Sequence, residues 1–377
     1  MRTLDQAELT GKTVFYRSDY NVPLADGKIA DDFRIVSTFP TLAKLMDAGC
    51  KIVIGTHLGR PEGVVVPELS LKPVAQRLAD EYPDRTIRFA HKLDGPEIND
   101  ALSLMKAGDI LLLENLRFDP REELNDPEFG KMLASTADLY VNDAFAADHR
   151  AHASIVGVPT YITGYAGPLL LREVTTLSNL LISPEHPFVV IMGGAKVSDK
   201  IGVIRQLGKV ADQLLIGGAM ANTFLLAKGE DISSSKAELD CLELARQLIQ
   251  ELGDKLVLAS DFVKKNSSDG TFQYLDIGPK AVEEFEDILS NAKTVFWNGS
   301  LGYAEDPKYA IATQSIATYI GNLVGIQSVV AGGDTIVSIS KLNLHDKFTF
   351  VSTGGGAALE LLAGGVLPGV VALEDKK

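Results

Sequence analysis

Few cysteines and no long apolar run occur in this sequence, and each absence excludes a class of protein. The 377 residues include only Cys50 and Cys241, which stand far apart, so neither a disulfide framework nor a cysteine zinc site is expected. No apolar run reaches the about 20 residues that a membrane-spanning helix needs, and the N-terminal residues lack the apolar core of a signal peptide. We therefore expect a soluble, cytoplasmic protein without a membrane partner.

Positive charge is also scarce. The chain has 36 lysines and arginines against 50 aspartates and glutamates, a formal net charge of −14. The summed field of such a protein repels polyanions, which argues against a nucleic-acid partner. An anionic ligand would need a local basic pocket, so the positions of the arginines carry information.

Two common nucleotide-binding motifs are missing. Gly11–Thr13 matches the end of a P-loop, but Gln6 stands where its first glycine belongs. Gly354 and Gly356 are followed by Leu359 where the dinucleotide fingerprint requires a third glycine. The absence of that fingerprint excludes a nicotinamide dehydrogenase, and any nucleotide site must be of another kind.

What the sequence does contain is a regular alternation of short apolar runs and amphipathic stretches. The runs that predict strands are Thr13–Arg17, Lys51–Gly55, Ile110–Leu113, Leu139–Asn142, Phe188–Met192, Gln213–Ile216, Leu256–Ala259, Thr294–Trp297, Ser328–Ala331 and Phe348–Ser352. The stretches that predict helices are Asp32–Asp47, Leu71–Tyr82, Lys236–Leu252, Pro279–Leu289 and Asp306–Ile320. Strands buried on both faces and joined by helices form parallel sheets, so we predict two doubly wound, Rossmann-like α/β domains.

The alternation is interrupted between Thr160 and Pro187. We interpret the stretch as a turn-rich segment leading into a helix over Leu169–Leu181, with Pro168 in its first turn and Ser183-Pro184 closing it. The predicted organisation is an N-terminal domain at residues 1–165, a helical hinge at 166–187 and a C-terminal domain at 188–360.

In the N-terminal half, polar and basic residues follow the predicted strands. Ligands of open parallel sheets bind beyond the carboxyl ends of the strands, so these residues are candidates for a site. Arg34, Arg60, Arg117 and Arg150 converging there would hold a small, multiply charged anion through their planar forks. A phosphorylated carboxylic acid fits that description.

Each of these residues has a plainer interpretation when taken alone. A single arginine is most often solvent-exposed, and His57 alone is more often a packing residue. Asp19 and Asn21 are either Asx-turn formers or contacts to a substrate hydroxyl. His149 and His152 lack a metal-ligand spacing, so we do not expect a zinc site.

In the C-terminal half, glycine-rich turns follow the strands. These turns are Gly193-Gly194-Ala195-Lys196, Gly217-Gly218-Ala219-Met220, Asn298-Gly299-Ser300, Gly332-Gly333-Asp334-Thr335 and Thr353-Gly354-Gly355-Gly356-Ala357. A glycine pair at a helix entry leaves N–H groups free to face phosphates, although one pair alone is more often a tight turn. Together with Lys196, Lys200 and Asp334, the turns favour a nucleotide with its Mg²⁺ beside Asp334.

At this point the motifs resemble those of the phosphoglycerate kinase family. The matching segments run in family order over nearly the whole chain: Arg17-Ser18-Asp19-Tyr20-Asn21-Val22-Pro23, His57-Leu58-Gly59-Arg60-Pro61, Glu114-Asn115-Leu116-Arg117-Phe118, Asn142-Asp143-Ala144-Phe145, Gly193-Gly194-Ala195-Lys196-Val197-Ser198-Asp199-Lys200, Trp297-Asn298-Gly299, Gly332-Gly333-Asp334-Thr335 and Ser352-Thr353-Gly354-Gly355-Gly356-Ala357. The resemblance implies Mg-dependent phosphoryl transfer between 1,3-bisphosphoglycerate and ADP in glycolysis, by a monomer whose C-terminal tail, 361–377, packs on the first domain.

The resemblance also assigns residues. Those implied to bind 3-phosphoglycerate are Asp19, Asn21, Arg34, His57, Leu58, Gly59, Arg60, Arg117 and Arg150. Those implied to bind ATP or ADP are Gly194, Lys196, Lys200, Gly217, Gly218, Asn298, Glu305, Gly332, Gly333, Asp334 and Thr335, with Mg²⁺ at Asp334. The candidates for neutralising the transferred phosphoryl group are Arg34, Lys196, Gly354, Gly355 and Gly356, which act together only if the two domains close.

Four positions depart from the family pattern. They are Ala219, Asn222, Tyr274 and Ser300, all expected near the adenosine, so they leave the nucleotide preference open. A hinge-type anion-binding protein also explains the arginines, but it leaves Lys196, Lys200 and Asp334 without a task.

Overall fold

In the computed structural model, which describes residues 1–374, the chain divides into two units. Unit 1 comprises Met1–Thr175 and the described residues from Val366 onward, and unit 2 comprises Thr176–Gly365. The division falls within helix α7 (Pro168–Ile182), inside the predicted segment 166–187, whose hinge role stays a prediction. The last three residues of the predicted tail lie outside the described part of the chain.

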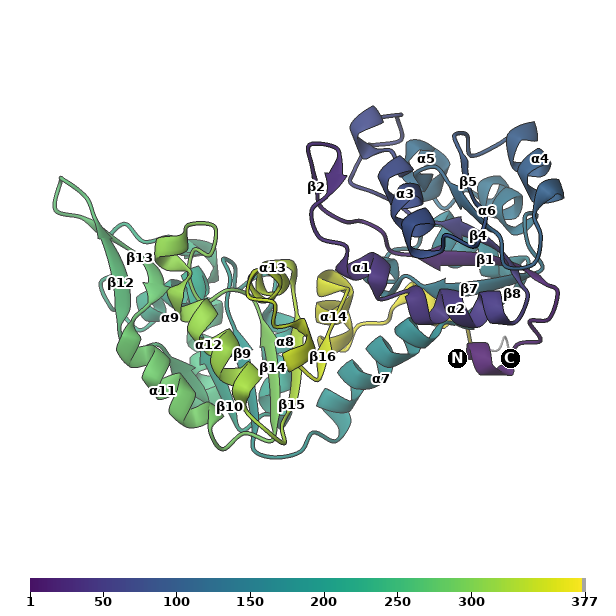
Figure 1. The fold of residues 1–377 in the computed structure, drawn as a ribbon. Helices are drawn as coiled ribbons and strands as arrows, with labels where there is room; N and C mark the ends of the chain where they lie inside the picture. Colours follow the sequence, from purple (N-terminus) through teal and green to yellow (C-terminus); the bar gives the residue numbers. More distant parts are fainter. Residues whose placement is uncertain (375–377) are drawn as a thin grey trace. The chain divides into compact units, whose positions relative to one another are not determined.

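Unit 1 is built on a six-stranded parallel sheet in the order β5-β6-β4-β1-β7-β8 (Figure 1). Its strands are β1 (Thr13–Ser18), β4 (Lys51–Gly55), β5 (Ile87–Ala90), β6 (Ile110–Leu113), β7 (Leu139–Asp143) and β8 (Thr163–Ala166). Its helices are α1 (Phe33–Val36), α2 (Phe39–Asp47), α3 (Lys72–Glu81), α4 (Pro96–Leu104), α5 (Pro120–Glu123), α6 (Pro127–Ala134) and α15 (Pro368–Val371). A short hairpin, β2 (Leu24–Ala25) with β3 (Lys28–Ile29), precedes α1.

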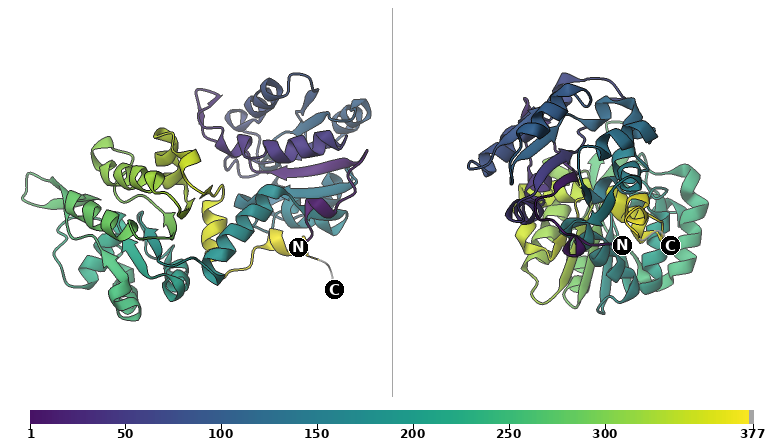
Figure 2. Two further views of the ribbon diagram at one scale, coloured as in Figure 1. Left: turned by 60° about the horizontal axis from the view of Figure 1, so that its bottom comes forward. Right: turned by 90° about the vertical axis from the view of Figure 1, so that its right-hand side faces the viewer.

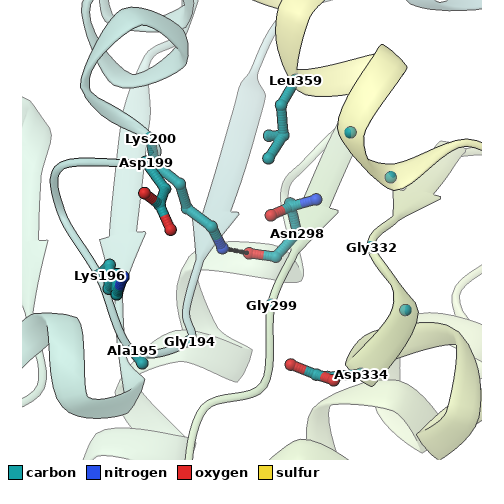
Figure 3. A pocket seen from close by; sticks show the side chains of 13 residues that line it. Gly194, Ala195, Lys196, Asp199, Lys200, Asn298, Gly299, Gly332, Asp334 and Leu359 are labelled. Carbon is teal, nitrogen blue, oxygen red and sulfur yellow. Dashed lines mark hydrogen bonds between the residues drawn. The ribbon is translucent and has the colours of Figure 1, made fainter. Parts of the chain in front are cut away.

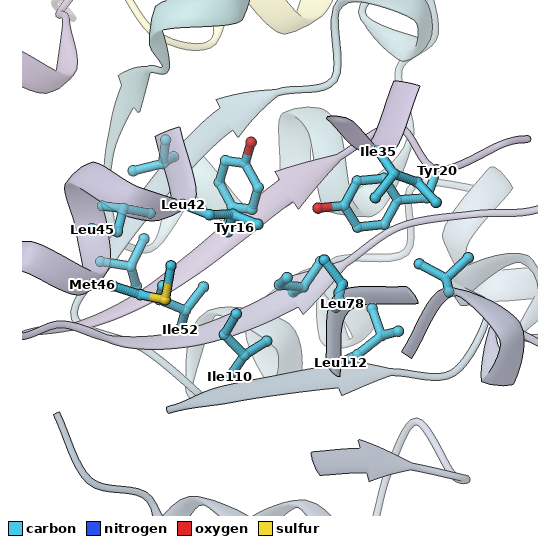
Figure 4. Close-up of a cluster of buried hydrophobic side chains, with 14 of the residues drawn as sticks. Tyr16, Tyr20, Ile35, Leu42, Leu45, Met46, Ile52, Leu78, Ile110 and Leu112 are labelled. Atoms are coloured by element: carbon cyan, nitrogen blue, oxygen red, sulfur yellow. The ribbon is translucent and has the colours of Figure 1, made fainter. Parts of the chain in front are cut away.

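The core of unit 1 lies between the sheet and helices α2 and α3 (Figure 4). Leu42 and Leu45 of α2 and Leu78 of α3 pack with Ile52 and Ile110 of the sheet, and all five are fully buried. Burying a side chain of this size contributes roughly 1.5–3 kcal/mol. This packing fixes the strands whose carboxyl ends bear the polar residues.

Two predictions for unit 1 were wrong. The segment interpreted as turn-rich contains an edge strand, β8, whose Tyr165 pairs with Val141 of β7. The predicted helix Asp32–Asp47 is two helices, because Pro40 has no N–H and is tolerated only in the first turn of a helix, so α2 starts anew at Phe39.

Unit 2 has a second six-stranded parallel sheet, in the order β11-β10-β9-β14-β15-β16. Its strands are β9 (Phe188–Met192), β10 (Gln213–Ile216), β11 (Leu256–Leu258), β14 (Thr294–Asn298), β15 (Gln327–Ala331) and β16 (Phe350–Val351). Its helices after α7 are α8 (Ile201–Val210), α9 (Gly218–Ala227), α10 (Leu242–Leu252), α11 (Pro279–Leu289), α12 (Ile311–Asn322), α13 (Gly333–Lys341) and α14 (Gly355–Leu362) (Figure 2). A separate antiparallel hairpin, β12 (Phe262–Asn266) with β13 (Phe272–Ile277), carries Tyr274.

The strand order of unit 2 has a functional consequence. The chain builds outward from β9 through β10 to β11, then returns to place β14 on the other side of β9. Open α/β sheets bind ligands beyond the carboxyl ends of the strands at such a reversal point. The turns after β9 and β14, which begin at Gly193 and Gly299, are therefore where a ligand is expected in unit 2.

The two parallel sheets with their flanking helices confirm the predicted doubly wound α/β architecture. Trp297, the only tryptophan, is fully buried in β14 and its Nε1 donates to the carbonyl of Gly299 at 2.8 Å. Among residues 1–374, no helix is both long enough and apolar enough to span a bilayer.

Candidate active site

The predicted anion-binding residues of unit 1 follow β1, β4, β6 and β7, which are neighbours in the parallel sheet, except Arg34, which lies in α1. Asp19 is nearly fully buried after β1, and its Oδ2 accepts a hydrogen bond from Arg34 Nη1 at 2.8 Å. The same Nη1 donates to the carbonyl of Asn21 at 3.0 Å. Asp19 Oδ1 also accepts from the N–H of Asn21 at 3.0 Å, so the Asx turn is real and the aspartate additionally orients Arg34.

The turn after β4 is held by two asparagines. Asn21 Oδ1 accepts from the N–H of Gly59 at 2.9 Å, and Asn115 Oδ1 accepts from the N–H of Leu58 at 3.2 Å. Gly59 has φ +66°, and a Cβ there would lie 2.7 Å from a side-chain carbon of Leu69, so only glycine fits. These contacts fix the backbone on either side of His57 and Arg60.

The remaining predicted arginines differ in exposure. Arg117 is almost fully buried; its Nη1 donates to the carbonyl of Gly59 at 2.8 Å, and its Nε lies 3.1 Å from Glu123 Oε1. Burial, followed by the charge of Arg150, lowers the pKa of Arg117 to about 10. Arg150 is partly buried with its Nε 3.2 Å from His149 Nε2, whereas Arg60 is exposed. Guanidinium groups whose charges raise one another's energy are poised to gain from a bound anion.

Sequence reasoning did not select Arg17, although it stands in the first motif. Arg17 is fully buried in β1, and its Nη2 lies 3.4 Å from His57 Nδ1. Burial and the charges of Arg17, Arg117 and Arg34 hold the pKa of His57 well below its usual range, so His57 is neutral. The sequence does contain a signal that could have selected Arg17, because this residue is an arginine at the end of an otherwise apolar strand.

In unit 2, a pocket of about 400 Å³ opens where the strand order predicts it (Figure 3). Its lining residues are Gly194, Ala195, Lys196, Asp199, Lys200, Asn298, Gly299, Gly332, Gly333, Asp334, Gly355, Gly356 and Leu359. Helices α13 and α14 both begin at this pocket, so their free N–H groups and positive dipole ends favour phosphate oxygens there.

Lys200 joins the two turns at the reversal point. Its Nζ donates to the carbonyl of Gly193 at 2.6 Å and to that of Asn298 at 3.1 Å; Figure 3 shows the second of these bonds. Burial lowers the pKa of Lys200 to about 8, opposed by the charges of Asp334 and Asp199. Lys196, by contrast, is exposed at the pocket edge.

Close backbone approach explains two of the glycines. A Cβ on Gly193 would lie 2.1 Å from the carbonyl oxygen of Ser300, which no side chain tolerates. Gly218 has φ +65°, and a Cβ there would lie 2.6 Å from the N atom of Gly194. The turns after β9, β10 and β14 therefore pack backbone to backbone and form the floor beneath the pocket.

A second pocket of about 410 Å³ shares Gly194, Ala195 and Asp334 with the first. Its other lining residues are Ala219, Lys236, Lys265, Gln273, Tyr274, Leu275, Ser300, Gly302, Tyr303 and Glu305. Three of the four positions that depart from the family pattern thus line this pocket. The fourth, Asn222, does not; it is buried and its Nδ2 donates to the carbonyl of Lys236 at 3.1 Å.

Four predicted residues line neither pocket. Gly217 and Gly218 form the turn packed beneath the first pocket. Gly354 is the buried residue just before α14. Thr335 is buried and its Oγ1 accepts from the N–H of Gly299 at 2.7 Å. The geometry gives all four a supporting position.

Within residues 1–374, no three histidine, cysteine or acidic side chains are grouped as a metal site. Asp334 is exposed in the first turn of α13 and faces both pockets. One carboxylate beside a pocket lined by two helix N-termini fits Mg²⁺ held mainly by phosphate oxygens and water, the usual arrangement for this ion.

A parallel α/β unit with arginines at its strand ends, and a second with a glycine-lined pocket at its reversal point, fit a phosphotransferase with two anionic substrates. Comparison with known proteins gives the family. The family model described as phosphoglycerate kinase matches residues 4–365. The phosphoglycerate kinases of Dictyoglomus turgidum and Akkermansia muciniphila are each 47% identical, over 99% of this chain and 98% of theirs.

Solved structures agree. Phosphoglycerate kinase from Coxiella burnetii is similar with a TM-score of 0.84 and 35% identity, over 98% of both chains. That from Pyrococcus horikoshii OT3 has a TM-score of 0.88 and 31% identity, over 99% of this chain and 98% of the other. The chain belongs to the phosphoglycerate kinase family. It is a glycolytic kinase whose substrates are a phosphoglycerate and a nucleotide.

Proposed function

We propose that unit 1 binds 3-phosphoglycerate, unit 2 binds Mg·ATP or Mg·ADP, and the enzyme moves a phosphoryl group reversibly between the two. The observation that carries this assignment is the contrast between the two sites. Unit 1 offers guanidinium groups that range from buried Arg117 to exposed Arg60, whereas unit 2 offers backbone amides, two helix N-termini and Lys200. The first suits a compact phosphorylated acid and the second a polyphosphate chain.

In this proposal Arg34, oriented by Asp19, donates to the carboxyl group that accepts the phosphoryl group, while Arg117, Arg150 and Arg60 hold the substrate phosphate. The other predicted contacts to 3-phosphoglycerate are Asn21, His57, Leu58 and Gly59. The fixed dipoles of the turns after β1 and β4 then need no rearrangement when the substrate arrives, which lowers the barrier.

On unit 2, Lys196, Lys200 and the amides of Gly355 and Gly356 are assigned to the nucleotide phosphates. The remaining nucleotide contacts predicted are Gly194, Gly217, Gly218, Asn298, Glu305, Gly332, Gly333, Asp334, Thr335 and Gly354. Bound Mg²⁺ would neutralise phosphate charge, with Asp334 orienting the waters around it. Phosphoryl transfer has a loose transition state, so the protein supplies position and charge and no covalent nucleophile. A monomeric state and a cytoplasmic location complete the proposal.

A coupled assay with 3-phosphoglycerate, Mg²⁺ and ATP tests the function directly. Turnover that requires all three components supports the proposal. No turnover by protein shown to be folded rejects it. The assay repeated with GTP addresses the nucleotide preference, because Ala219, Tyr274 and Ser300 line the second pocket.

Lys200→Met and Asp334→Ala are each expected to weaken Mg·ADP binding by roughly 10- to 100-fold, because a hydrogen bond or ion contact to a charged ligand is lost. The affinity for 3-phosphoglycerate should not change. Calorimetric titration of each ligand checks this. Lys209→Met is the control, since Lys209 is exposed on α8 and outside both pockets. Equal weakening of both ligands would contradict the assignment of the two sites to different units.

Mg·ADP binding at pH 9 is expected to take up roughly one proton. Free Lys200, with its pKa lowered to about 8, is mostly neutral at that pH, and a phosphate beside Nζ restores the charged form. Calorimetry in two buffers of different ionisation enthalpy measures the uptake. Lys200→Met should show none, and an equal uptake in this variant would assign the proton to another group.

A further inference from the structure

A chain of hydrogen bonds in unit 1 runs from α5 to the predicted substrate site. Glu122 is fully buried; its Oε2 accepts from the N–H of Ser154 at 2.9 Å and its Oε1 accepts from Ser154 Oγ at 2.5 Å. Ser154 Oγ in turn accepts from Arg17 Nε at 2.7 Å. Arg17 Nη2 lies 3.4 Å from His57 Nδ1, which completes the chain.

The two hydrogen bonds that join Arg17, Ser154 and Glu122 have a defined direction. A guanidinium group can only donate, so Ser154 Oγ accepts from Arg17 and its own O–H donates to Glu122. The backbone N–H of Ser154 can likewise only donate. Both oxygens of Glu122 therefore accept. Burial raises the pKa of Glu122, whereas the charge of Arg17 and the hydrogen bonds from Ser154 oppose that shift and favour the carboxylate.

The same reasoning reaches His57. If Arg17 Nη2 donates to Nδ1, that nitrogen carries no proton, and the proton of the neutral ring sits on Nε2. The rival acceptor for an Nδ1–H is Asp19 Oδ1, which lies 3.9 Å away and already accepts from Asn21. The other ionisable groups around His57 are Arg34, Arg117 and His152. The two guanidinium groups can only donate, and burial lowers the pKa of His152 to about 3, so none of the three is an anionic acceptor for an Nδ1–H.

Charge balance gives Glu122 a second effect. The carboxylate offsets the buried charge of Arg17 through a single hydroxyl group, so Arg17 can stay in place as part of the framework. Arg17 Nη1 also donates to the carbonyl of Ser18. Removing the charge of Glu122 would weaken the hydrogen bond that orients Arg17 Nε, and with it the contact of Nη2 with His57.

We propose that Glu122 is a positioning residue for the phosphoglycerate site, acting through Ser154 and Arg17 to hold His57 as the Nε2–H tautomer that donates to the anionic substrate. The role of His57 as a substrate contact rests on the proposed function. The tautomer of His57 does not, so the two can be tested separately.

The first experiment uses the unaltered full-length protein. Nitrogen-15 NMR of the histidine rings at pH 7, with His57 assigned by a His57→Gln variant, should show a neutral ring protonated at Nε2. A ring protonated at Nδ1, or at both nitrogens, would overturn the proposal whatever the enzyme's activity.

The second experiment breaks the chain. In Glu122→Gln and Ser154→Ala, the His57 ring should become a mixture of tautomers, and KM for 3-phosphoglycerate should rise about tenfold, as for a weakened hydrogen bond to a charged ligand. KM for ATP should stay as in the wild type. Asp143→Asn is the matched control, because Asp143 is also a buried carboxylate of unit 1 but bonds to Tyr16, Thr41 and Leu170.

The outcomes separate the two claims. A single Nε2–H tautomer retained in folded Glu122→Gln would remove Glu122 from the positioning role. A tautomer change without any change in KM for 3-phosphoglycerate would also overturn the proposal, because His57 would then not be the contact through which Glu122 acts. Wild-type protein that lacks kinase activity but shows the Nε2–H ring would instead count against the proposed function.

Discussion

Replacing Arg34 with alanine is expected to lower kcat about 100- to 1,000-fold, the usual cost of removing one donor that stabilises developing charge. Only Nη1 of Arg34 is engaged, by Asp19 and the carbonyl of Asn21. Its Nε and Nη2 make no hydrogen bond with any residue among 1–374, so two edges of an oriented guanidinium are available to the reacting group. If Arg34 merely held the ground state, KM would rise while kcat stayed constant.

Steady-state kinetics of Arg34→Ala and Arg34→Lys decide between these roles. Lysine should restore activity only in part, because a point charge cannot reproduce the planar fork. Arg77→Ala is the matched control: Arg77 is also partly buried in unit 1, but it pairs with Asp32 and Glu81. A near-normal kcat in Arg34→Ala, on protein shown by thermal melting to be folded, would leave Arg34 as a binding residue only.

Asp148→Asn is expected to stabilise the protein at pH 8 by on the order of 2–4 kcal/mol while changing little at pH 4. Asp148 is fully buried; Asn142 Nδ2 donates to its Oδ1 at 2.8 Å, and its Oδ2 has no hydrogen-bond partner among the described residues. Burial raises the pKa of Asp148 to about 7, with Asn142 and Arg17 opposing and Asp143 adding to the shift.

The direction of this change in stability with pH follows from the two pKa values of Asp148. The folded-state pKa of about 7 exceeds the unfolded value of about 3.9, so the folded state holds its proton more tightly. The stability from protonated Asp148 is complete below about pH 4 and is lost as pH rises through about 7. Urea unfolding followed by circular dichroism at both pH values, with exposed Asp5→Asn as control, measures it. An unchanged difference between wild type and variant at the two pH values would refute the prediction.

Much of this fold could be predicted from hydrophobic patterning. Lys51–Gly55 and Phe188–Met192 begin and end where the sequence predicts, because a central strand buried on both faces must be apolar throughout. The two edge strands of unit 1 do not follow that rule. β8 and β5 have one neighbour each and include Gly164 and Arg88, so they carry no continuous apolar run.

The site, like the sheets, has residues that the sequence can predict and residues that it cannot. Residues in strand-end turns, such as Arg117 and Lys200, could be selected because parallel sheets bind ligands there. Ser154 and Glu122 could not be selected from the sequence, because they reach the site through Arg17 and lie in segments with no such rule. Gly217 is the opposite case, a residue that the sequence selects although it lines neither pocket. A glycine is needed there to leave room for Leu301, and in sequence such a glycine looks the same as one in a phosphate-binding turn.

The burial of Trp297 gives the chain a built-in optical label. With no second indole in 377 residues, fluorescence excited at the red edge of aromatic absorption comes from unit 2 alone. The ring is bonded to the carbonyl of Gly299, a residue that lines the pocket assigned to phosphates. We therefore expect its emission to report nucleotide binding and the unfolding of unit 2 without a contribution from unit 1.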